Sequence, residues 1–340
     1  MKLATGGATV TRVIFACTAM VACMQAMPAY AQRLDPDVRV LRAILEKPEA
    51  DIDLARAKLT IDQLIDRAVD IEGTLAKLDA MAATIKALAG PRAKSTEIAQ
   101  VLRTYLYDAG AWNHRQPFRY DLEGDPLGRE ISGKLLTNYL ATRKGNCVSM
   151  PTLFVLLAQR LGLDATFAAS PGHIFVKFRD DTGRWYNLET TSGGYPRKDE
   201  SYQRDTPMTP LALKNGIYMR PLSKKESVAN TMIGTLMEHY SSTGKLERTI
   251  AIADLVLEHY PRDVDAMLHK GNAYYLLLKR DFLKRYPTPR DIPMEDRSRF
   301  RALERDNRLW YEKAEALGWR EPDTGADRRY LEKVKTVKSN

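Results

Sequence analysis

Cys147 stands at the start of a strongly apolar stretch, RKGNCVSMPTLFVLLAQRLGLDA at residues 143–165, and this position favours a reactive thiol. The pattern predicts a helix that ends near Gly162. Pro151 must lie close to the N-terminus of that helix, because proline removes a hydrogen bond anywhere further along. Unpaired amides and the helix dipole at that end stabilise a thiolate, the nucleophilic form of cysteine. Cys147 is therefore the candidate nucleophile.

His173 is the candidate base, because nucleophilic catalysis by cysteine needs a proton acceptor within hydrogen-bonding reach. His173 begins a predicted strand, and Asn187 and Glu189 share one face of the next strand, at residues 185–191. A register that pairs His173 with Glu189 places Asn187 diagonally, whereas a slip of one residue would separate them. Glu189 is the first choice for the group that orients the imidazole, and Asn187 is the alternative.

Each of these residues also has a purely structural interpretation. A lone thiol is commonly a buried, inert side chain, a histidine at a strand start can simply be hydrogen-bonded, and Glu189 can be an exposed strand residue. What favours chemistry is that all three occur together at suitable spacing. No spacing typical of metal ligands occurs, so no metal or cofactor is expected.

The elements that must position these residues are mostly helices around a small antiparallel sheet. Residues 165–178 and 185–191 are expected to form two strands, joined as a hairpin by the turn RDDTGR. Residues 110–133 form a long loop, and loops of this length are commonly functional, so Trp112 and His114 are candidates for the wall of a cleft. Helices are predicted at residues 39–45, at 54–88 with a break near Gly73, at 95–107 and at 134–143.

From Val228 onward the sequence pattern is helical again and suggests a repeat. Four residues stand near the places expected in a tetratricopeptide repeat of about 34 residues: Tyr240, Gly244, Ala253 and Pro261. A second copy is interrupted at residues 279–296 and resumes at residues 309–317. Two such units bury little surface alone, so we expect them to pack on the preceding domain and to offer a surface for a protein partner.

Taken together, the blocks GNC, PTLFVLLAQRLGLDA, PGHIFVKF and WYNLETT resemble the transglutaminase-like superfamily, whose fold shares a Cys-His-acid geometry with papain-type proteases. The resemblance covers residues 51–194 well and is strongest to a bacterial branch in which such a core precedes tetratricopeptide repeats. It implies that Cys147 is the nucleophile and His173 the base, and that Glu189 stands where the superfamily usually has Asp. Some members of this branch lack the cysteine, so the fold alone does not guarantee activity.

The reaction implied by this resemblance is acyl transfer. The thiolate attacks an amide or ester carbonyl, His173 moves the proton, and water or an amine resolves the thioester. The backbone amide of Cys147 is the expected oxyanion donor, and Asn146 and Asn138 are candidates for a side-chain donor. Hydrolysis is favoured over crosslinking because water is always available. The alternative function is a non-catalytic scaffold that binds a protein partner.

The N-terminus is typical of an exported protein. A basic start, an apolar stretch at residues 13–27 and the sequence PAYAQ predict a signal peptide cleaved after Ala31. Acylation of Cys23 in a lipoprotein is the less favoured alternative. Cleavage leaves Cys147 as the single thiol and lowers the formal charge from +9 to about +7. We expect a periplasmic or secreted protein with no membrane span and no nucleic-acid partner.

These interpretations define an α+β protein of four parts. With 340 residues, of which 44% are hydrophobic, the chain can form more than one core. The expected activity is that of a cysteine hydrolase (protease or amidase) or a transamidase acting on a protein or peptide. The parts are a signal peptide (1–31), a transglutaminase-like domain with N-terminal helices (32–222), a tetratricopeptide-like helical region (223–320) and a basic tail (321–340).

Overall fold

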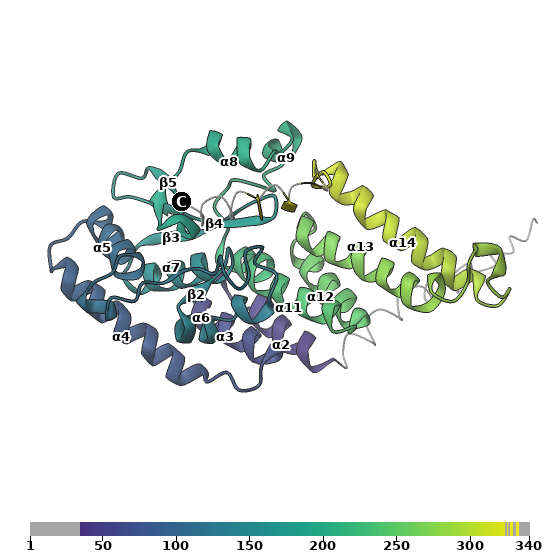
Figure 1. Ribbon diagram of the computed structural model, residues 1–340, viewed down its shortest axis with the longest axis horizontal. Coiled ribbons are helices and arrows are strands. Elements are labelled where there is room, and N and C mark those ends of the chain that lie inside the picture. Colours follow the sequence, from purple (N-terminus) through teal and green to yellow (C-terminus); the bar gives the residue numbers. More distant parts are fainter. Residues whose placement is uncertain (1–34, 324, 326, 329–330, 333–340) are drawn as a thin grey trace, which may run out of the picture.

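The computed structural model describes residues 35–323, 325, 327–328 and 331–332, in which helices surround a small sheet and a helical arm extends to one side (Figure 1). The expected signal peptide and most of the basic tail lie outside the described residues. The helices before the sheet are α2 (Pro36–Leu45), α3 (Leu54–Ile65), α4 (Ile71–Ala89), α5 (Ser95–Tyr107), α6 (Leu136–Thr142) and α7 (Ser149–Arg160). Those after it are α8 (Asp199–Asp205), α9 (Pro210–Lys214), α10 (Lys224–Ser227), α11 (Gly234–Ser242), α12 (Leu246–His259), α13 (Val264–Leu278) and α14 (Arg297–Ala316).

The main sheet is antiparallel, in the order β3-β4-β5-β6. Its strands are β3 (Asp164–Ser170), β4 (His173–Arg179), β5 (Trp185–Glu189) and β6 (Tyr195–Pro196). The strand expected to begin at His173 is observed as β4, but residues 165–178 hold two strands and not one. Pro171 and Gly172 form a tight turn, with Gly172 at a φ of 66°, and the turn folds this segment into two paired strands.

The register between β4 and β5 differs by two residues from the expected one. Lys177 pairs with Asn187, so Glu189 does not lie directly opposite His173. A shift of two residues leaves every side chain on its original face, because the side-chain period of a strand is two. Glu189 therefore shares a face with His173 and is placed diagonally from it.

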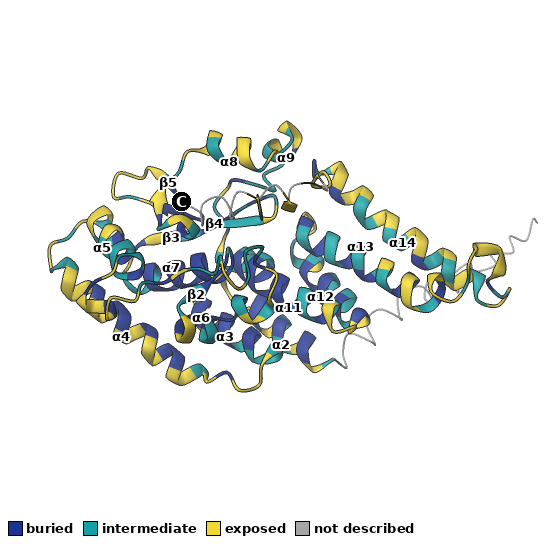
Figure 2. Cartoon of the chain, viewed as in Figure 1, coloured by how far each residue is buried: buried dark blue, intermediate teal, exposed yellow. Residues whose placement is uncertain are grey.

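Helix α7 forms the centre of the core, and Cys147 lies just before its first residue. All residues from Ser149 to Ala158 are buried, which explains why the segment is apolar on every side (Figure 2). Pro151 occupies the first turn, as the sequence predicts. The helix packs on β3 and β4 on one side and on α4, α5 and α6 on others. The N-terminus of α7 is thus held rigidly against the strand that carries His173.

The two helices expected between residues 54 and 88 are separated at residues 66–70, and not near Gly73. Asp70 is the N-cap of α4, and its Oδ1 accepts a hydrogen bond from the N–H of Gly73 at 3.0 Å. Gly73 therefore lies in the first helical turn, because a good capping residue defines a helix start more strongly than a glycine breaks one. Helix α4 ends at Ala89, and its C-cap is Gly90, whose φ of 83° suits glycine.

The C-terminal helices pack on the N-terminal ones. Helices α10 and α11 are joined by a π-helical segment, η5 (Val228–Ile233), and α11 and α12 lie against α3 and α2. The Oη of Tyr240 donates to Oδ2 of Asp37 at 2.6 Å. One hydrophobic core runs from Val38 to Ala266 and crosses residue 222, where the domain boundary is predicted. The expected packing is observed, and the boundary itself stays a prediction.

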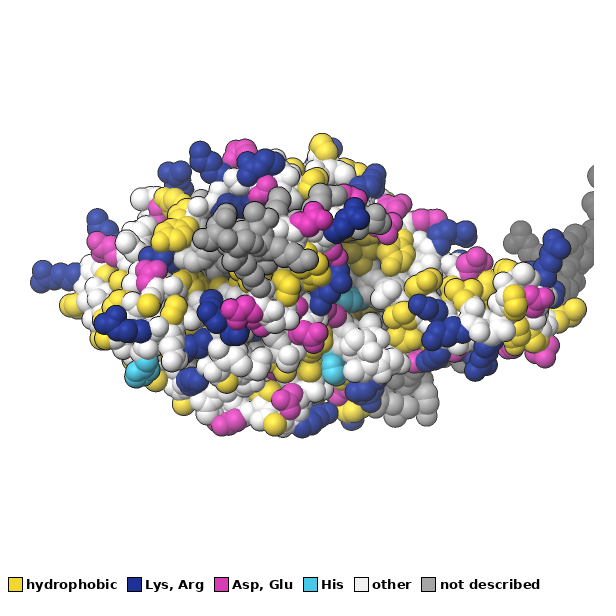
Figure 3. Space-filling model, in the orientation of Figure 1, with side chains coloured by type: hydrophobic (Ala, Val, Ile, Leu, Met, Phe, Trp, Pro, Cys, Tyr) yellow, Lys and Arg dark blue, Asp and Glu magenta, His cyan; other side chains and the backbone are white. Residues whose placement is uncertain are grey.

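The described residues contain no helix that is both long and apolar enough to cross a bilayer. Figure 3 shows basic and acidic side chains interspersed over the visible face, with no large area of one sign.

Candidate active site

Cys147 lies two residues before α7, in a turn that Asn146 stabilises. Oδ1 of Asn146 accepts hydrogen bonds from the N–H groups of Val148 (3.0 Å) and Ser149 (3.2 Å), and Ser149 Oγ accepts from the N–H of Asn146 (3.1 Å). These bonds satisfy amides that a helix start leaves unpaired. In the described part of the chain, no group accepts from the N–H of Cys147. That amide is the expected oxyanion donor.

His173 is hydrogen-bonded to Glu189 from the neighbouring strand. The two atoms involved, Nε2 and Oε2, lie 2.8 Å apart. Because Nε2 is occupied, Nδ1 is the ring nitrogen left for a second partner, and the thiol of Cys147 is near enough to help raise the pKa of His173. The Cys147 thiol is partly exposed, and the side chain of His173 is 19% exposed. The structure therefore brings together the cysteine, the histidine and the carboxylate that the sequence analysis selected.

Glu189 is buried and held from several directions. Its Oε1 accepts bonds from the N–H and Oγ1 of Thr191, at 3.1 and 2.6 Å. Its Oε2 accepts a bond from Tyr202 Oη at 2.9 Å in addition to that from His173, and Arg197 lies 3.6 Å away. A carboxylate with this many donors has one orientation, and it fixes the plane of the imidazole.

Asn187, the alternative orienting group, does not contact His173. It lies opposite Lys177, and its Nδ2 donates to the carbonyl of Arg197 (2.9 Å) and to Oδ1 of Asp199 (2.5 Å). Asn187 therefore joins the sheet to the segment that leads into α8. Of the two candidates, only Glu189 is placed to orient the base.

The electrostatics of the pair favour a charged imidazole. Burial is the largest influence on His173 and lowers its pKa, but the hydrogen bonds to Cys147 and Glu189 outweigh it and raise the pKa to about 10. Burial likewise acts to raise the pKa of Glu189, yet the bonds from His173, Thr191 and Tyr202 bring it to about 2. At neutral pH the arrangement is an imidazolium between a carboxylate and the thiol sulfur.

A cavity of about 750 Å³ opens in front of the cysteine and the histidine. Cys147, His173 and residues 169–174 form one wall, and residues 127–129 of the predicted long loop form part of the rim. The opposite wall comes from the C-terminal helices, including residues 259–265. The volume is within the range of about 300–1,000 Å³ that is common for ligand sites.

The remaining candidates lie apart from this cavity. Asn146 is buried and stabilises the turn, and its Nδ2 has no partner among the described residues, but Asn146 does not line the cavity. Nδ2 of Asn138 donates to the carbonyl of Ser132 on the surface. Trp112 and His114 sit at a 3-10 turn, with Trp112 37% exposed, and neither lines the cavity. Their proposed place in the cleft wall is wrong for these two residues, because only the end of the loop reaches the cavity.

Sequence reasoning missed Tyr202 and the whole C-terminal wall. Tyr202 belongs to α8, a helix that the sequence analysis did not predict, and its ring stacks on Phe175 with centroids 4.2 Å apart. No local pattern connects Tyr202 with Glu189, because Tyr202 lies thirteen positions further along the chain, after another strand. Within the described residues, no group of three metal-ligating side chains is present.

Residues 72–228 match the family model of the transglutaminase-like superfamily, so this chain contains a transglutaminase-like domain. The domain spans the cysteine, the histidine and the glutamate of the site. At the family level, it suggests acyl transfer of the cysteine-protease type. The match ends before α11, and it therefore gives no support to tetratricopeptide repeats in the helices that follow.

Two curated relatives come from Xylella fastidiosa, and each is called a UPF0162 protein. One, from strain 9a5c, is 23% identical over 171 residues, and the other, from strain Temecula1, is 25% identical over 173 residues. Each alignment covers 47% of this chain and 60% of the relative. The chain thus spans less than two thirds of the length of these relatives. No solved structure matches this chain.

Proposed function

We propose that this protein is an exported cysteine hydrolase that cleaves an amide bond in a protein or peptide, with Cys147 as nucleophile, His173 as base and Glu189 as the orienting acid. The observation that carries the proposal is that Cys147 and His173 line one cavity while His173 is hydrogen-bonded to the buried Glu189. The transglutaminase-like match over residues 72–228 supports acyl transfer through a cysteine.

In the proposed first step, Sγ of Cys147 attacks the carbonyl carbon of the substrate. A carbon–sulfur bond forms, the carbonyl electron pair moves to oxygen, and the free N–H of Cys147 donates to that oxyanion. The intermediate collapses as the carbon–nitrogen bond breaks, and the imidazolium of His173 gives its proton to the leaving amine. The product of this half-reaction is a thioester on Cys147 and a neutral His173.

In the second half-reaction, water attacks the thioester carbonyl and gives a proton to His173. The carbon–sulfur bond then breaks, the carboxylic acid leaves, and the thiolate–imidazolium pair is restored. Glu189 stabilises the imidazolium in this state and keeps its ring in place. Hydrolysis is proposed over transamidation because water needs no dedicated binding site.

Two parts of the proposal rest on the sequence alone. Export to the periplasm or beyond depends on residues 1–31, with acylation of Cys23 as the alternative. The tetratricopeptide-like interpretation of residues 223–320, and with it a protein partner bound by those helices, depends on residue spacing. Neither part affects the chemistry proposed for the cavity.

The proposal is tested by the reactivity of Cys147. We expect iodoacetamide to alkylate this residue rapidly at about pH 6.5, as read by peptide-resolved mass spectrometry, because the imidazolium stabilises the thiolate. His173→Ala is expected to slow that reaction about 100-fold, since an ordinary thiol is only about 1% ionised two pH units below its usual range near 8.5.

His114→Ala is the matched control, because it removes a histidine that does not line the cavity. It is expected to leave the alkylation rate unchanged. Slow alkylation in wild type, with no effect of His173→Ala, would instead support a non-catalytic scaffold. In the active case, Cys147→Ala protein incubated with an envelope extract should retain peptides or proteins that the wild type cleaves and releases.

A further inference from the structure

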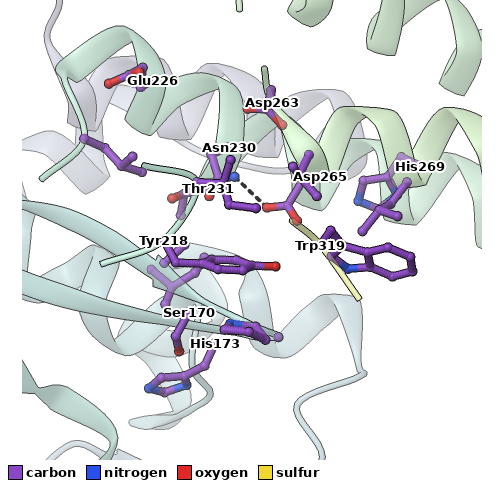
Figure 4. Close-up of a pocket in the computed structure, with 18 of the residues that line it drawn as sticks. Ser170, His173, Tyr218, Glu226, Asn230, Thr231, Asp263, Asp265, His269 and Trp319 are labelled. Carbon is purple, nitrogen blue, oxygen red and sulfur yellow. Dashed lines mark hydrogen bonds between the residues drawn. The ribbon is translucent and has the colours of Figure 1, made fainter. Parts of the chain in front are cut away.

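The cavity in front of Cys147 has a second chemically distinct wall. It is formed by the start of α13, where Asp263 is the N-cap and Asp265 lies in the first turn, and by Asn230 and Thr231 of η5. Figure 4 shows these side chains gathered above Tyr218, with His173 and Ser170 below it. A substrate in this cavity therefore meets the reacting groups on one side and two carboxylates on the other.

Within the described residues these two carboxylates form no ion pair. The pKa of Arg220 is raised by its hydrogen bond to Glu226 and only further by the charge of Asp263. Lys134 pairs with Glu238, Arg129 with Asp327, and Arg220 forms two hydrogen bonds with Glu226. Arg262 is exposed and donates to the carbonyl of Asn215. Among the described residues, no lysine or arginine forms an ion pair with Asp263 or Asp265, although both are only partly exposed.

The pKa values of both carboxylates are raised, chiefly by burial. Burial, and next the charge of Asp265, raise the pKa of Asp263 to about 7. Burial also raises the pKa of Asp265, against a hydrogen bond from Asn230. A positive charge bound beside these carboxylates would therefore stabilise their ionised form.

Two buried hydroxyl groups without partners line the same cavity. Thr231 is 2% exposed and Ser170 is 3% exposed, and neither Oγ atom has a hydrogen-bond partner among the described residues. Oδ1 of Asn230 is unpartnered too, while its Nδ2 donates to Asp265 Oδ2 at 2.5 Å. Buried hydroxyls left unpaired are costly, so their presence in a cavity wall indicates a polar ligand.

Aromatic rings complete the wall. Trp319 and Tyr218 line the cavity, and burial and then the negative charge of nearby Asp265 raise the pKa of Tyr218. The faces of such rings attract cations, and they also exclude water from the carboxylates. Two acids, unpaired acceptors and aromatic faces form a set that suits an ammonium group.

The helix start alone does not account for this arrangement. Oδ1 of Asp263 caps α13 by accepting a bond from the N–H of Ala266 at 2.8 Å, and acidic residues are generally favourable there. Asp265, however, is bonded to Asn230 of another helix, and capping gives no role to the hydroxyls of Thr231 and Ser170.

We propose that the cavity binds an acyl substrate that carries a primary ammonium group, and that Asp265, assisted by Asp263, holds this group while the amide to be cleaved lies at Cys147. The inference rests on the proposed hydrolase function and adds the substrate class. The ammonium can belong to a lysine side chain or to a free amino terminus. Both sources share the same chemistry, and the experiment separates them.

The test is binding of three small amides to the full chain with Cys147→Ser, measured by isothermal titration calorimetry. The amides are Nα-acetyl-lysine N-methylamide, norleucine N-methylamide with a free amino group, and the neutral Nα-acetyl-norleucine N-methylamide. We expect at least one of the two cationic amides to bind at least tenfold more tightly than the neutral one. The amide that does so identifies the source of the ammonium.

Asp265→Asn is expected to reduce that preference at least tenfold. Asp263→Asn is expected to reduce it about threefold, and asparagine at this position keeps the cap of α13. The control is Glu312→Gln, an exposed acid on α14 outside the cavity, with an equal change of net charge. Equal binding of all three amides, no binding of any, or an unchanged preference in Asp265→Asn overturns the inference. Alkylation of Cys147 is measured separately, so a result that overturns the proposed substrate class leaves the test of the hydrolase intact.

Discussion

At the scale of single residues, the geometry of the site depends on the buried carboxylate of Glu189. Glu189 has no freedom to move, because Thr191, Tyr202 and His173 all donate to it. Burial lowers the pKa of His173, but Cys147 and Glu189 together outweigh it and raise that pKa to about 10. The longer side chain of Glu, compared with the Asp usual in the superfamily, suits its diagonal position across the strands.

Glu189→Gln is expected to lower the free energy of unfolding by about 2 kcal/mol near pH 5.5, since it removes a charge-assisted buried hydrogen bond. The depressed pKa of Glu189, about 2 against an ordinary 4.5, gives stability above pH 4.5 that is lost as the pH falls through 2. The raised pKa of His173, about 10 against 6.5, gives stability below pH 6.5 that is lost as the pH rises through 10. Urea unfolding at several pH values should show the largest difference between pH 4.5 and 6.5. A difference independent of pH would contradict this.

Tyr202→Phe is expected to cost about 2 kcal/mol of unfolding free energy, because Glu189 loses a donor while the ring stacking on Phe175 is kept. It should also slow the alkylation of Cys147 several-fold at about pH 6.5, since the imidazole is less firmly held. Tyr186→Phe is the control, because its hydroxyl donates to Asp180 at the exposed hairpin turn. Equal effects of the two substitutions on alkylation would argue against a positioning role for Tyr202.

At the scale of elements, the start of α7 is the critical feature. The helix is buried from Ser149 to Ala158, so its N-terminus cannot shift to suit a substrate. The turn before it depends on Asn146, whose side chain occupies the amides of Val148 and Ser149 and leaves that of Cys147 free. Asn146 thus caps the start of the helix, while the neighbouring Cys147 keeps its N–H for the proposed chemistry.

Asn146→Ala is expected to cost about 1–2 kcal/mol in unfolding free energy, the usual loss for a capping side chain. It should also slow the alkylation of Cys147, because the thiol is then less firmly positioned at the helix end. Asn138→Ala is a suitable comparison, since the Asn138 side chain bonds one carbonyl on the surface. Chemical denaturation and alkylation rates measure both effects. If Asn146→Ala changes neither the unfolding free energy nor the alkylation rate, the turn is fixed by the rest of the core and not by Asn146.

At the scale of the whole molecule, a buried ion pair connects the N-terminal helices to the domain that carries the site. Lys58 and Asp62 of α3 are fully buried, with Nζ and Oδ1 2.5 Å apart. Lys58 also donates to the carbonyl of Lys134 (2.9 Å), and Asp62 accepts from the N–H of Leu136 (3.0 Å). The pair therefore hydrogen-bonds two backbone groups at the start of α6 and fixes α3 against that helix.

Lys58→Met is expected to lower the free energy of unfolding by about 3–5 kcal/mol, because it leaves the carboxylate of Asp62 buried without its partner. The double variant Lys58→Met with Asp62→Leu should recover part of this loss, although the backbone groups of Lys134 and Leu136 remain unpaired. Urea unfolding of the three proteins measures the coupling. A double variant less stable than Lys58→Met would contradict an electrostatic cause.

The sequence predicted the cysteine, the histidine and the preferred acid of the site, even though the strand register was wrong by two residues. Alternation along a strand has a period of two, so an even error preserves the face on which Glu189 lies. The break between α3 and α4, the strand at residues 164–170 and helix α8 were placed wrongly or missed. Those features depend on Asp70 as a cap, on a two-residue turn at Pro171 and on packing that local patterns do not reveal.

By itself, the sequence determined which groups are candidates for the chemistry: a thiol at a helix start, an imidazole at a strand start and a carboxylate of the right parity. These are short-range properties, set by the backbone geometry of helices and strands. Only the tertiary structure decided that Tyr202 supports Glu189 and that the start of α13 faces Cys147 across a cavity. Such contacts join residues far apart in the chain, and they arise from the packing of one continuous core, which no local spacing encodes.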